Sequence, residues 1–129
     1  MILLDTHVLV WSQIDRRRLT RAALSAMRRA ERTDGLAISA ISLVELASLL
    51  YRGRVSHSGN IELTIREYIG DFIVKPITLD IAVLTAQFPA DFPSDPMDRI
   101  IAATARAKGL PLVTADERIL SCSLVKTIW

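Results

Sequence analysis

The chain has 129 residues, of which 50% are apolar, with 16 basic and 14 acidic side chains and a formal net charge of +2. This length predicts one domain spanning residues 1–129, large enough to fold without disulfides or a structural metal. The apolar fraction and low net charge exclude a disordered chain. No stretch without a charged residue exceeds ten residues, which excludes a transmembrane helix of about 20.

The amino terminus and the cysteine content indicate a cytoplasmic protein. The segment Met1–Asp5 meets an acidic residue before any basic one, so we do not expect a signal peptide. Cys122 is the only cysteine, which excludes an internal disulfide and fits a reducing compartment. One cysteine and two histidines cannot build a closed zinc site by themselves.

Short apolar runs alternate with helical patterns along the chain. In the first half we expect a strand at Ile2–Leu4, a helix capped by Thr20 and closed at Asp34-Gly35, a strand at Leu36–Ser39, an apolar helix at Ser42–Tyr51, a polar loop at Arg54–Asn60 and a helix at Ile61–Ile69. In the second half we expect a strand at Phe72–Val74, a helix from a Thr78 cap to Ala86, a loop at Phe88–Ser94, a helix from Asp95-Pro96 to Lys108, a strand at Leu112–Val113, one helical turn at Asp116–Leu120 and a strand at Val125–Trp129. Strands separated by helices predict an α/β fold, with three α/β/α layers around a central parallel sheet.

Most familiar catalytic patterns are absent, and the position of four carboxylates stands out instead. The sequence has no glycine-rich phosphate loop, dinucleotide-binding turn or nucleophile elbow. Asp5 and Asp116 follow predicted strands, and Glu45 and Asp98 lie near the start of predicted helices. Because these positions share the carboxyl edge of a parallel sheet, we expect all four acids on one rim.

The electrostatic repulsion within such a group of acids must be offset. Two carboxylates about 4 Å apart repel by about 4 kcal/mol at an effective dielectric near 20, and a single domain has little stability to spare. Either some acids are protonated or a cation lies among them. Oxygen ligands favour Mg²⁺ or Mn²⁺, and such an ion, with water and a substrate phosphate, is common equipment for phosphodiester hydrolysis.

Each acid also has a purely structural interpretation. Asp5 and Asp116 fit turn or N-cap positions, and Asp95 fits the N-cap of the helix that contains Asp98. Asp98 fits a variant capping box as well as it fits a ligand. Glu45 is a lone charge in an apolar helix, with no basic residue at helical spacing, which favours a functional role.

Basic and aromatic residues supply further candidates. Seven arginines and one acid lie between residues 16 and 32: Arg16, Arg17, Arg18, Arg21, Arg28, Arg29 and Arg32. This segment fits binding to phosphate or to an acidic partner, or a solvated helix face. His7 fits a base or a polar helix-start residue, and Arg99 fits a phosphate contact or an exposed helix residue. Trp11 and Trp129 are expected in the core or at a partner contact.

Four segments together resemble the PIN-domain ribonucleases, and more narrowly the VapC toxins of bacterial and archaeal toxin–antitoxin pairs. The segments are Leu3–Trp11, Ser42–Leu46, Asp98–Ala105 and Leu112–Asp116. The resemblance covers essentially the whole chain. It implies a PIN-like fold and a Mg²⁺- or Mn²⁺-dependent endoribonuclease that cuts single-stranded or loop RNA. We hypothesise that metal-activated hydroxide attacks the phosphate in line, which predicts products with 5′-phosphate and 3′-hydroxyl ends. The resemblance also implies a VapB-type antitoxin as partner and toxin homodimers.

The resemblance further implies residue roles. Asp5, Glu45 and Asp98 match the three core acids of the family, and Asp116 matches a fourth, more variable one. Thr6 and Thr114 match positions that support the acids. Asp95, in the segment Asp95-Pro96-Met97, departs from the commonest pattern, which leaves open whether it joins the metal site.

An acidic site needs a basic rim to attract RNA, and the candidates are Arg16–Arg18 and Arg28–Arg32. Two alternatives compete with a nuclease. A non-catalytic RNA- or protein-binding α/β module would use the acids as helix caps. A metal-dependent phosphatase is disfavoured because position 7, where that class usually has a second Asp, is His.

Overall fold

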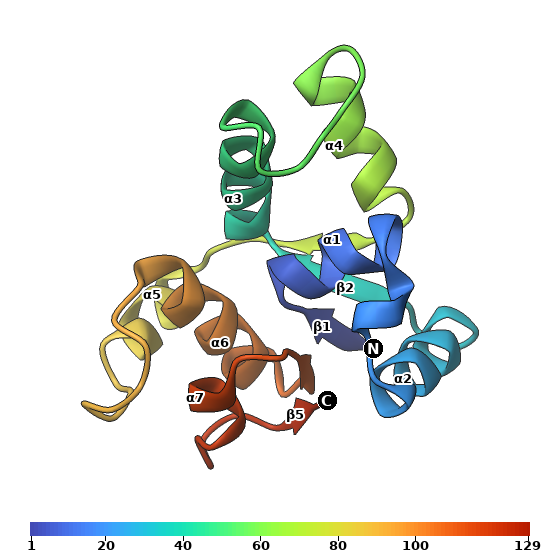
Figure 1. Ribbon diagram of the computed structural model, residues 1–129. Coiled ribbons are helices and arrows are strands. Elements are labelled where there is room, and N and C mark those ends of the chain that lie inside the picture. Colours follow the sequence, from blue (N-terminus) through green and yellow to red (C-terminus); the bar gives the residue numbers. More distant parts are fainter.

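A five-stranded parallel sheet forms the centre of the computed structural model, which describes residues 1–129 (Figure 1). The strands are β1 (Ile2–Leu4), β2 (Leu36–Ser39), β3 (Ile73–Lys75), β4 (Leu112–Val113) and β5 (Thr127–Ile128). Their order is β3-β2-β1-β4-β5, and every neighbouring pair is parallel. All five carboxyl ends therefore point to the same edge of the sheet.

Helices connect the strands, as parallel pairing requires. They are α1 (Thr6–Ile14), the 3-10 turn η1 (Arg16–Arg18), α2 (Arg21–Glu31), α3 (Ala40–Tyr51), α4 (Ile61–Ile69), α5 (Leu79–Thr85), α6 (Pro96–Lys108) and α7 (Glu117–Leu120). No helix has both the length and the apolar character that crossing a membrane demands.

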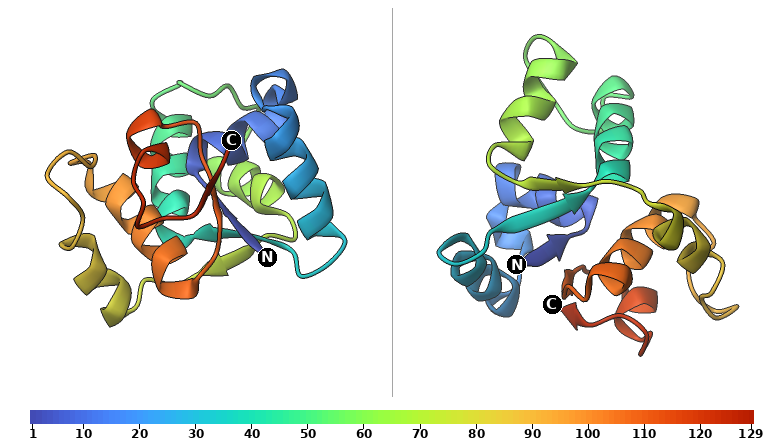
Figure 2. Two further views of the ribbon diagram at one scale, coloured as in Figure 1. Left: turned by 90° about the horizontal axis from the view of Figure 1, so that it is seen from below. Right: turned by 180° about the vertical axis from the view of Figure 1, so that it is seen from behind.

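The sheet is buried on both faces, because successive side chains of each strand point to opposite sides. Ile2 and Leu4 pack with α1, α2 and α3 in one hydrophobic cluster. Leu3 packs with α5, α6 and α7 in a second cluster on the other face. Helices accordingly lie on either side of the strands (Figure 2). The predicted three-layer α/β/α architecture is confirmed.

Local signals fixed several element boundaries as predicted. The Thr20 hydroxyl accepts a hydrogen bond from the Ala23 amide at 3.1 Å and begins α2. Asp95 caps α6, and Gly109 ends it in the left-handed conformation, with φ of 62°. The strand β2 and the helix α4 have the predicted bounds.

Two local predictions need correction, and one helix was not predicted. The helix α3 begins at Ala40, earlier than predicted, because the Ser39 hydroxyl accepts from the Ile41 amide at 3.3 Å. Thr78 precedes α5, but its hydroxyl contacts the Asp80 carboxylate instead of capping the helix. No element was predicted for α1, because this helix is buried on most sides and has no apolar stripe to reveal its period.

Candidate active site

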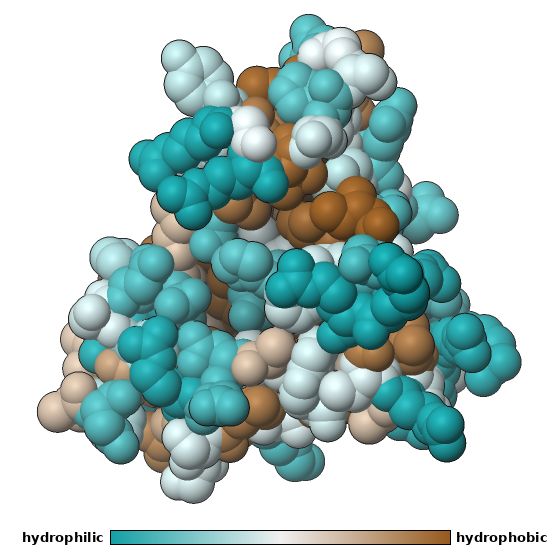
Figure 3. All heavy atoms as spheres, viewed as in Figure 1, coloured by the Kyte–Doolittle hydropathy of each residue, from teal (hydrophilic) through white to brown (hydrophobic).

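A pocket of about 330 Å³ lies at the carboxyl edge of the sheet. It is lined by Asp5, His7, Trp11, Glu45, Asp95, Asp98, Ala115 and Asp116. The structure therefore brings together the four acids predicted from sequence, and Asp95 with them. Figure 3 shows the surface hollowed in the region between α1, α3 and α6, with hydrophilic residues around the opening.

Each acid reaches the pocket from a different segment. Asp5 follows β1 and precedes α1, and Asp116 follows β4 and caps α7. Glu45 lies in the second turn of α3, and Asp98 lies in the first turn of α6. Because β1, β2 and β4 are parallel neighbours, the segments that leave their carboxyl ends converge, and α6, which leads into β4, begins at that same edge.

Asp5 is the most buried of these acids, with 7% of its surface exposed. The Thr114 hydroxyl donates a hydrogen bond to Asp5 Oδ2 at 2.8 Å, and it accepts one from the Asp116 amide at 3.1 Å. Burial raises the pKa of Asp5, and the hydrogen bond from Thr114 opposes that rise. Thr114 thus fixes one Asp5 oxygen and favours the ionised carboxylate.

The pKa of Asp98 shows the effect of the neighbouring carboxylates most clearly. Burial, together with the negative charges of Asp5, Asp95, Glu45 and Asp116, raises this pKa to about 6. All the other acids of the pocket therefore act on Asp98. A carboxyl group in this environment binds a proton readily, or a cation if one is available.

Glu45 has an unsatisfied oxygen. Its Oε1 atom is buried and has no hydrogen-bond partner. A buried carboxylate oxygen without a partner is costly, and for a charged group the penalty exceeds the 1–3 kcal/mol or so of a neutral one. The isolated charge that the sequence places in α3 therefore remains unpaired in the folded chain.

Buried hydroxyl groups hold the surrounding helices in position. The Thr6 hydroxyl donates to Ser42 Oγ at 2.9 Å, which links the start of α1 to α3 one turn before Glu45. The Thr104 hydroxyl on α6 lies 3.5 Å from Ser39 Oγ, which ends β2. Thr6 therefore acts on the site through α3. Neither Ser42 nor Thr104 was singled out from the sequence, because a buried hydroxyl in an apolar helix has no distinguishing local pattern.

Asp95 and Asp116 combine a capping role with access to the pocket. Asp95 Oδ1 accepts from the Met97 amide at 2.9 Å, and Asp116 Oδ1 accepts from the Arg118 amide at 2.9 Å. Both residues nevertheless line the pocket. Asp98 makes no capping hydrogen bond, so its position is not explained by helix capping.

The oxygen ligands of this pocket fit a hard divalent cation that binds few protein side chains directly. No three side chains of the Asp, Glu, His or Cys types stand close enough to form a ready-made ligand group. Mg²⁺ commonly binds through one or two carboxylates and completes its shell with water and substrate phosphate. The orphaned Glu45 oxygen and the raised pKa of Asp98 are what an acidic pocket of this kind shows before a cation is bound.

The predicted basic contacts fall in different places. Arg18 lines a cavity that adjoins the acidic pocket, and its guanidinium lies 4.2 Å from the centre of the Trp11 ring. Arg16 donates to the Ser12 carbonyl, and Arg17 pairs with Asp15. Arg28 and Arg29 are exposed in the last turn of α2 and line no cavity at the acids.

Arg99 has a structural role. Its guanidinium donates to the Pro93 carbonyl at 2.8 Å and to the Thr85 carbonyl at 3.0 Å, which joins α6 to the loop before it and to α5. It is half-buried rather than exposed. The structure therefore uses Arg99 to hold the segment that carries Asp98, and it is not among the residues around the acidic pocket.

His7 and Trp11 are aromatic neighbours at the pocket. Their ring centres are 6.1 Å apart, and the ring centres of Trp11 and Trp129 are 6.0 Å apart. Trp11 is half-buried between the core and the pocket wall, which refines the expectation of a core residue.

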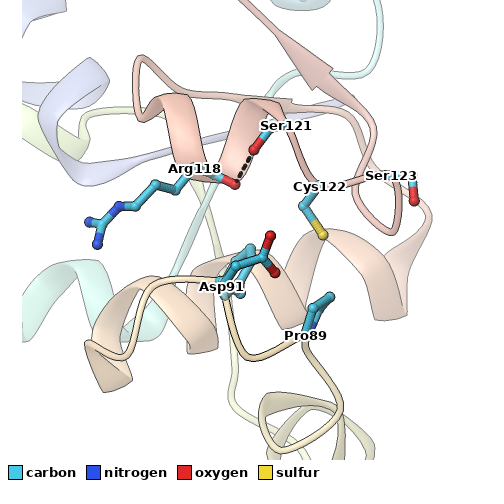
Figure 4. A pocket seen from close by; sticks show the side chains of 7 residues that line it. Pro89, Asp91, Arg118, Ser121, Cys122 and Ser123 are labelled. Carbon is cyan, nitrogen blue, oxygen red and sulfur yellow. Dashed lines mark hydrogen bonds between the residues drawn. The ribbon is translucent and has the colours of Figure 1, made fainter.

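A smaller cavity of about 130 Å³ lies between α7 and the loop before α6 (Figure 4). Its lining includes Asp91 and Cys122, while the Arg118 guanidinium points away from Cys122. It shares no lining residue with the acidic pocket. One carboxylate and one thiol do not make a ligand set, so the chemistry of the molecule concentrates at the four acids.

Comparison with known proteins agrees with this geometry. The profile of the PIN domain matches residues 2–122. The chain belongs to the PIN-domain family. It is 37% identical over 120 residues to Ribonuclease VapC22 of Mycobacterium tuberculosis (strain ATCC 25618 / H37Rv), which covers 93% of this chain and 90% of that protein.

Solved structures share the PIN-domain fold. The crystal structure of VapBC2 from Rickettsia felis bound to a promoter DNA fragment matches with a TM-score of 0.74 at 16% identity, covering 98% of this chain and 97% of that one. DNA-bound VapBC from Salmonella typhimurium matches with a TM-score of 0.73 at 21% identity, with the same coverage of both chains. At these identities the likeness concerns the fold.

Proposed function

We propose that this PIN-domain protein is a Mg²⁺- or Mn²⁺-dependent endoribonuclease and the toxin of a VapBC-type pair. The name of its relative, Ribonuclease VapC22, supports the activity and substrate class. The structural neighbours include complexes described as VapBC, which supports a VapB-type antitoxin as partner. The proposal includes a cytoplasmic location, a toxin homodimer and single-stranded or loop RNA as substrate.

One observation carries the nuclease proposal: four carboxylates from separate segments line one pocket, and the buried Glu45 Oε1 has no partner there. A capping role explains Asp95 and Asp116 in part, but it explains neither Glu45 nor Asp98. Asp116 pairs with Arg118 at 3.4 Å, but Asp5, Glu45 and Asp98 have no ion-pair partner, so a purely structural use of these three leaves their mutual repulsion uncompensated.

Asp5 and Asp98 would hold the cation most directly, and Glu45 and Asp116 would bind it through water or hold a second ion. When bound, a divalent ion supplies activation of water for attack on phosphorus and neutralisation of the charge that develops on the phosphate. Thr114 orients Asp5 and favours its ionised form, and the Thr6–Ser42 hydrogen bond keeps the helix of Glu45 against α1. Because ligand carboxylates must be ionised, cation affinity should fall as the pH drops below about 6, where Asp98 takes up a proton.

The direct test is incubation of the purified protein with structured RNAs in the presence of Mg²⁺, Mn²⁺ or EDTA. We expect cleavage with either metal, no cleavage in EDTA, and products with 5′-phosphate and 3′-hydroxyl ends. Asp98→Asn removes a charge at nearly constant volume, so it should abolish cleavage while the protein still unfolds cooperatively on heating. Cleavage that persists in EDTA would refute the metal, and RNA binding without turnover would favour a binding module.

A further inference from the structure

We infer that a groove lined by Arg18, Arg52 and Arg54 leads away from the acidic pocket and holds the backbone of the RNA strand next to the scissile phosphate. This inference rests on the proposed nuclease function. It names which chain segments contact the substrate beyond the acids, and it selects a different set of arginines from the one that the sequence suggests.

The groove is continuous because neighbouring cavities share lining residues. A cavity of about 380 Å³ shares Glu45 and Asp95 with the acidic pocket and adds Arg52 and Arg54. A second cavity of about 310 Å³ shares His7 and Trp11 with the acidic pocket and adds Arg18. The two outer cavities meet at Leu49 and Arg54. The three hollows therefore form one depression around the start of α1 and the exposed side of α3.

The three arginines are free to bind an anion. Each is exposed, and none makes an ion pair or a side-chain hydrogen bond with a polar group. Arg52 and Arg54 share a cavity with Glu45 and Asp95, yet no pair of these opposite charges lies within ion-pair distance. Open space therefore separates acids on one side from guanidinium groups on the other.

Backbone contacts fix where the arginines are. Gly53, with φ of 69°, reverses the chain between Arg52 and Arg54 just after α3 ends. The Arg54 amide donates to the Leu49 carbonyl at 3.0 Å, and the following residue, Val55, is buried. On the other side of the groove, stacking on Trp11 holds the guanidinium of Arg18. In Figure 3 hydrophilic residues gather beside the end of α3 and over α1.

This charge distribution fits a polyanionic strand better than a small molecule. A phosphate bridged by a cation to the acids would have its neighbours along the strand facing the arginines, whose planar donors match phosphate oxygens. An acidic pocket alone repels RNA, so affinity must come from cations close to it. Arg28 and Arg29 are equally exposed and unpaired, but they line none of these three cavities.

The test compares two variants that each remove two exposed arginines, Arg52→Gln/Arg54→Gln and the control Arg28→Gln/Arg29→Gln. Cleavage is measured on a single-stranded RNA of about 12 nucleotides and on a dinucleotide, whose single phosphate is the scissile one, at several KCl concentrations. Each lost phosphate contact lowers the salt slope by about 0.7, so two lower it by about 1.4. Between about 50 and about 200 mM KCl, wild-type kcat/KM on the long RNA should therefore fall about sevenfold more than that of the groove variant.

Four results distinguish the alternatives. The inference predicts a raised KM and a reduced salt slope on the long RNA for the groove variant alone, with dinucleotide cleavage unchanged. Equal loss on both substrates overturns it, because the effect then acts through the acidic pocket. A wild-type salt slope in the groove variant also overturns it while leaving the nuclease intact. A wild-type protein that neither cuts nor binds either RNA refutes the proposed function and the groove together.

Discussion

Two concentrations of charge in this molecule have opposite relations to the sequence. The arginines of residues 16–32 are close together in the chain, but the structure spreads them over η1 and α2, exposed to solvent. The acids Asp5, Glu45, Asp98 and Asp116 are far apart in the chain, but the structure gathers them in one pocket. A run of charges on a helix disperses around its axis, whereas charges at the ends of parallel strands converge. The four acids, although far apart in sequence, are therefore better candidates for a functional site than the arginines.

The largest effect is expected from loss of the hydrogen bond between Thr114 and Asp5 in the acidic pocket. Thr114→Val should lower kcat/KM by about 10- to 100-fold, as is typical when a partner of a metal-binding residue is lost. Because the Thr114 bond lowers the pKa of Asp5, its loss should raise that pKa and move the acidic limb of the pH–rate profile to higher pH. The measurement is kcat/KM against pH with Mg²⁺ present.

Thr33→Val is the matched control for this change, because Thr33 is exposed and its hydroxyl bonds only to neighbours in the α2 terminus. It should leave both the rate and the profile unchanged. A similar effect of both substitutions would show that Thr114 has no special relation to Asp5.

The acids should also make the stability of the metal-free protein depend on pH. The pKa of Asp98 is raised to about 6 in the folded state, so between the unfolded value of 3.8 and about 6 the folded protein binds more protons than the unfolded chain. Stability therefore falls as the pH rises through about 6, and the raised pKa of the buried Asp5 acts in the same direction. Thermal unfolding in EDTA across this range should give a falling midpoint.

Two additions sharpen this measurement. Asp98→Asn should remove much of the fall, because the titrating group is gone. Mg²⁺ should raise the unfolding midpoint more above pH 6 than below it, since only the ionised acids bind the cation. A midpoint that rises through this window in the metal-free wild type would contradict the crowding of the acids.

Glu45→Gln should stabilise the protein when no metal is bound. The substitution removes one of the five negative charges that line the pocket. It also replaces a charged group that has a buried oxygen without a hydrogen-bond partner by a neutral group, which costs less to bury. Each kcal/mol gained should raise the unfolding midpoint by about 4 °C for a chain of this size. Glu62→Gln, on the exposed side of α4 in an ion pair with Arg66, is the control and should gain nothing. Loss of stability in Glu45→Gln would mean that the charge has a partner.

The smallest effect is expected from the arginines that are most prominent in the sequence. Arg28→Gln/Arg29→Gln should change the free energy of unfolding by no more than about 0.5 kcal/mol, as for most surface substitutions. It should also leave RNA cleavage within about twofold of wild type, a difference of less than about 0.5 kcal/mol. Thermal unfolding and the cleavage assay check both values. A large loss of cleavage would give the arginine helix a role in substrate binding and weaken the contrast with the acids.

Local chemistry made much of the fold predictable. Alternation of buried strands with capped helices gave the layers, and Thr20, Asp95 and Gly109 marked helix ends because their hydrogen bonds are made within a few residues. The helix α1 escaped prediction because it is apolar on most sides, and the early start of α3 depends on Ser39, whose small side chain also suits the strand it ends.

The candidate site was predictable from local sequence only in part. Asp5, Glu45, Asp98 and Asp116 stood out because each follows a strand or starts a helix, and the parallel sheet brings such positions to one edge. Ser42 and Thr104 did not stand out, since their partners lie on other elements. Arg52 and Arg54 flank a glycine after the helix of Glu45. Only the tertiary structure places them beside the acids, because this turn lines cavities together with Glu45 and with residues of α1.

The order of residues alone determined which elements form and which of their ends carry charge, because secondary structure and capping depend on near neighbours. The folded chain decided which charges meet, which arginines stay free, and which oxygen of Glu45 loses its water. Those outcomes depend on packing between elements tens of residues apart, and their energies arise from burial and from the distances between charges that only the assembled sheet sets.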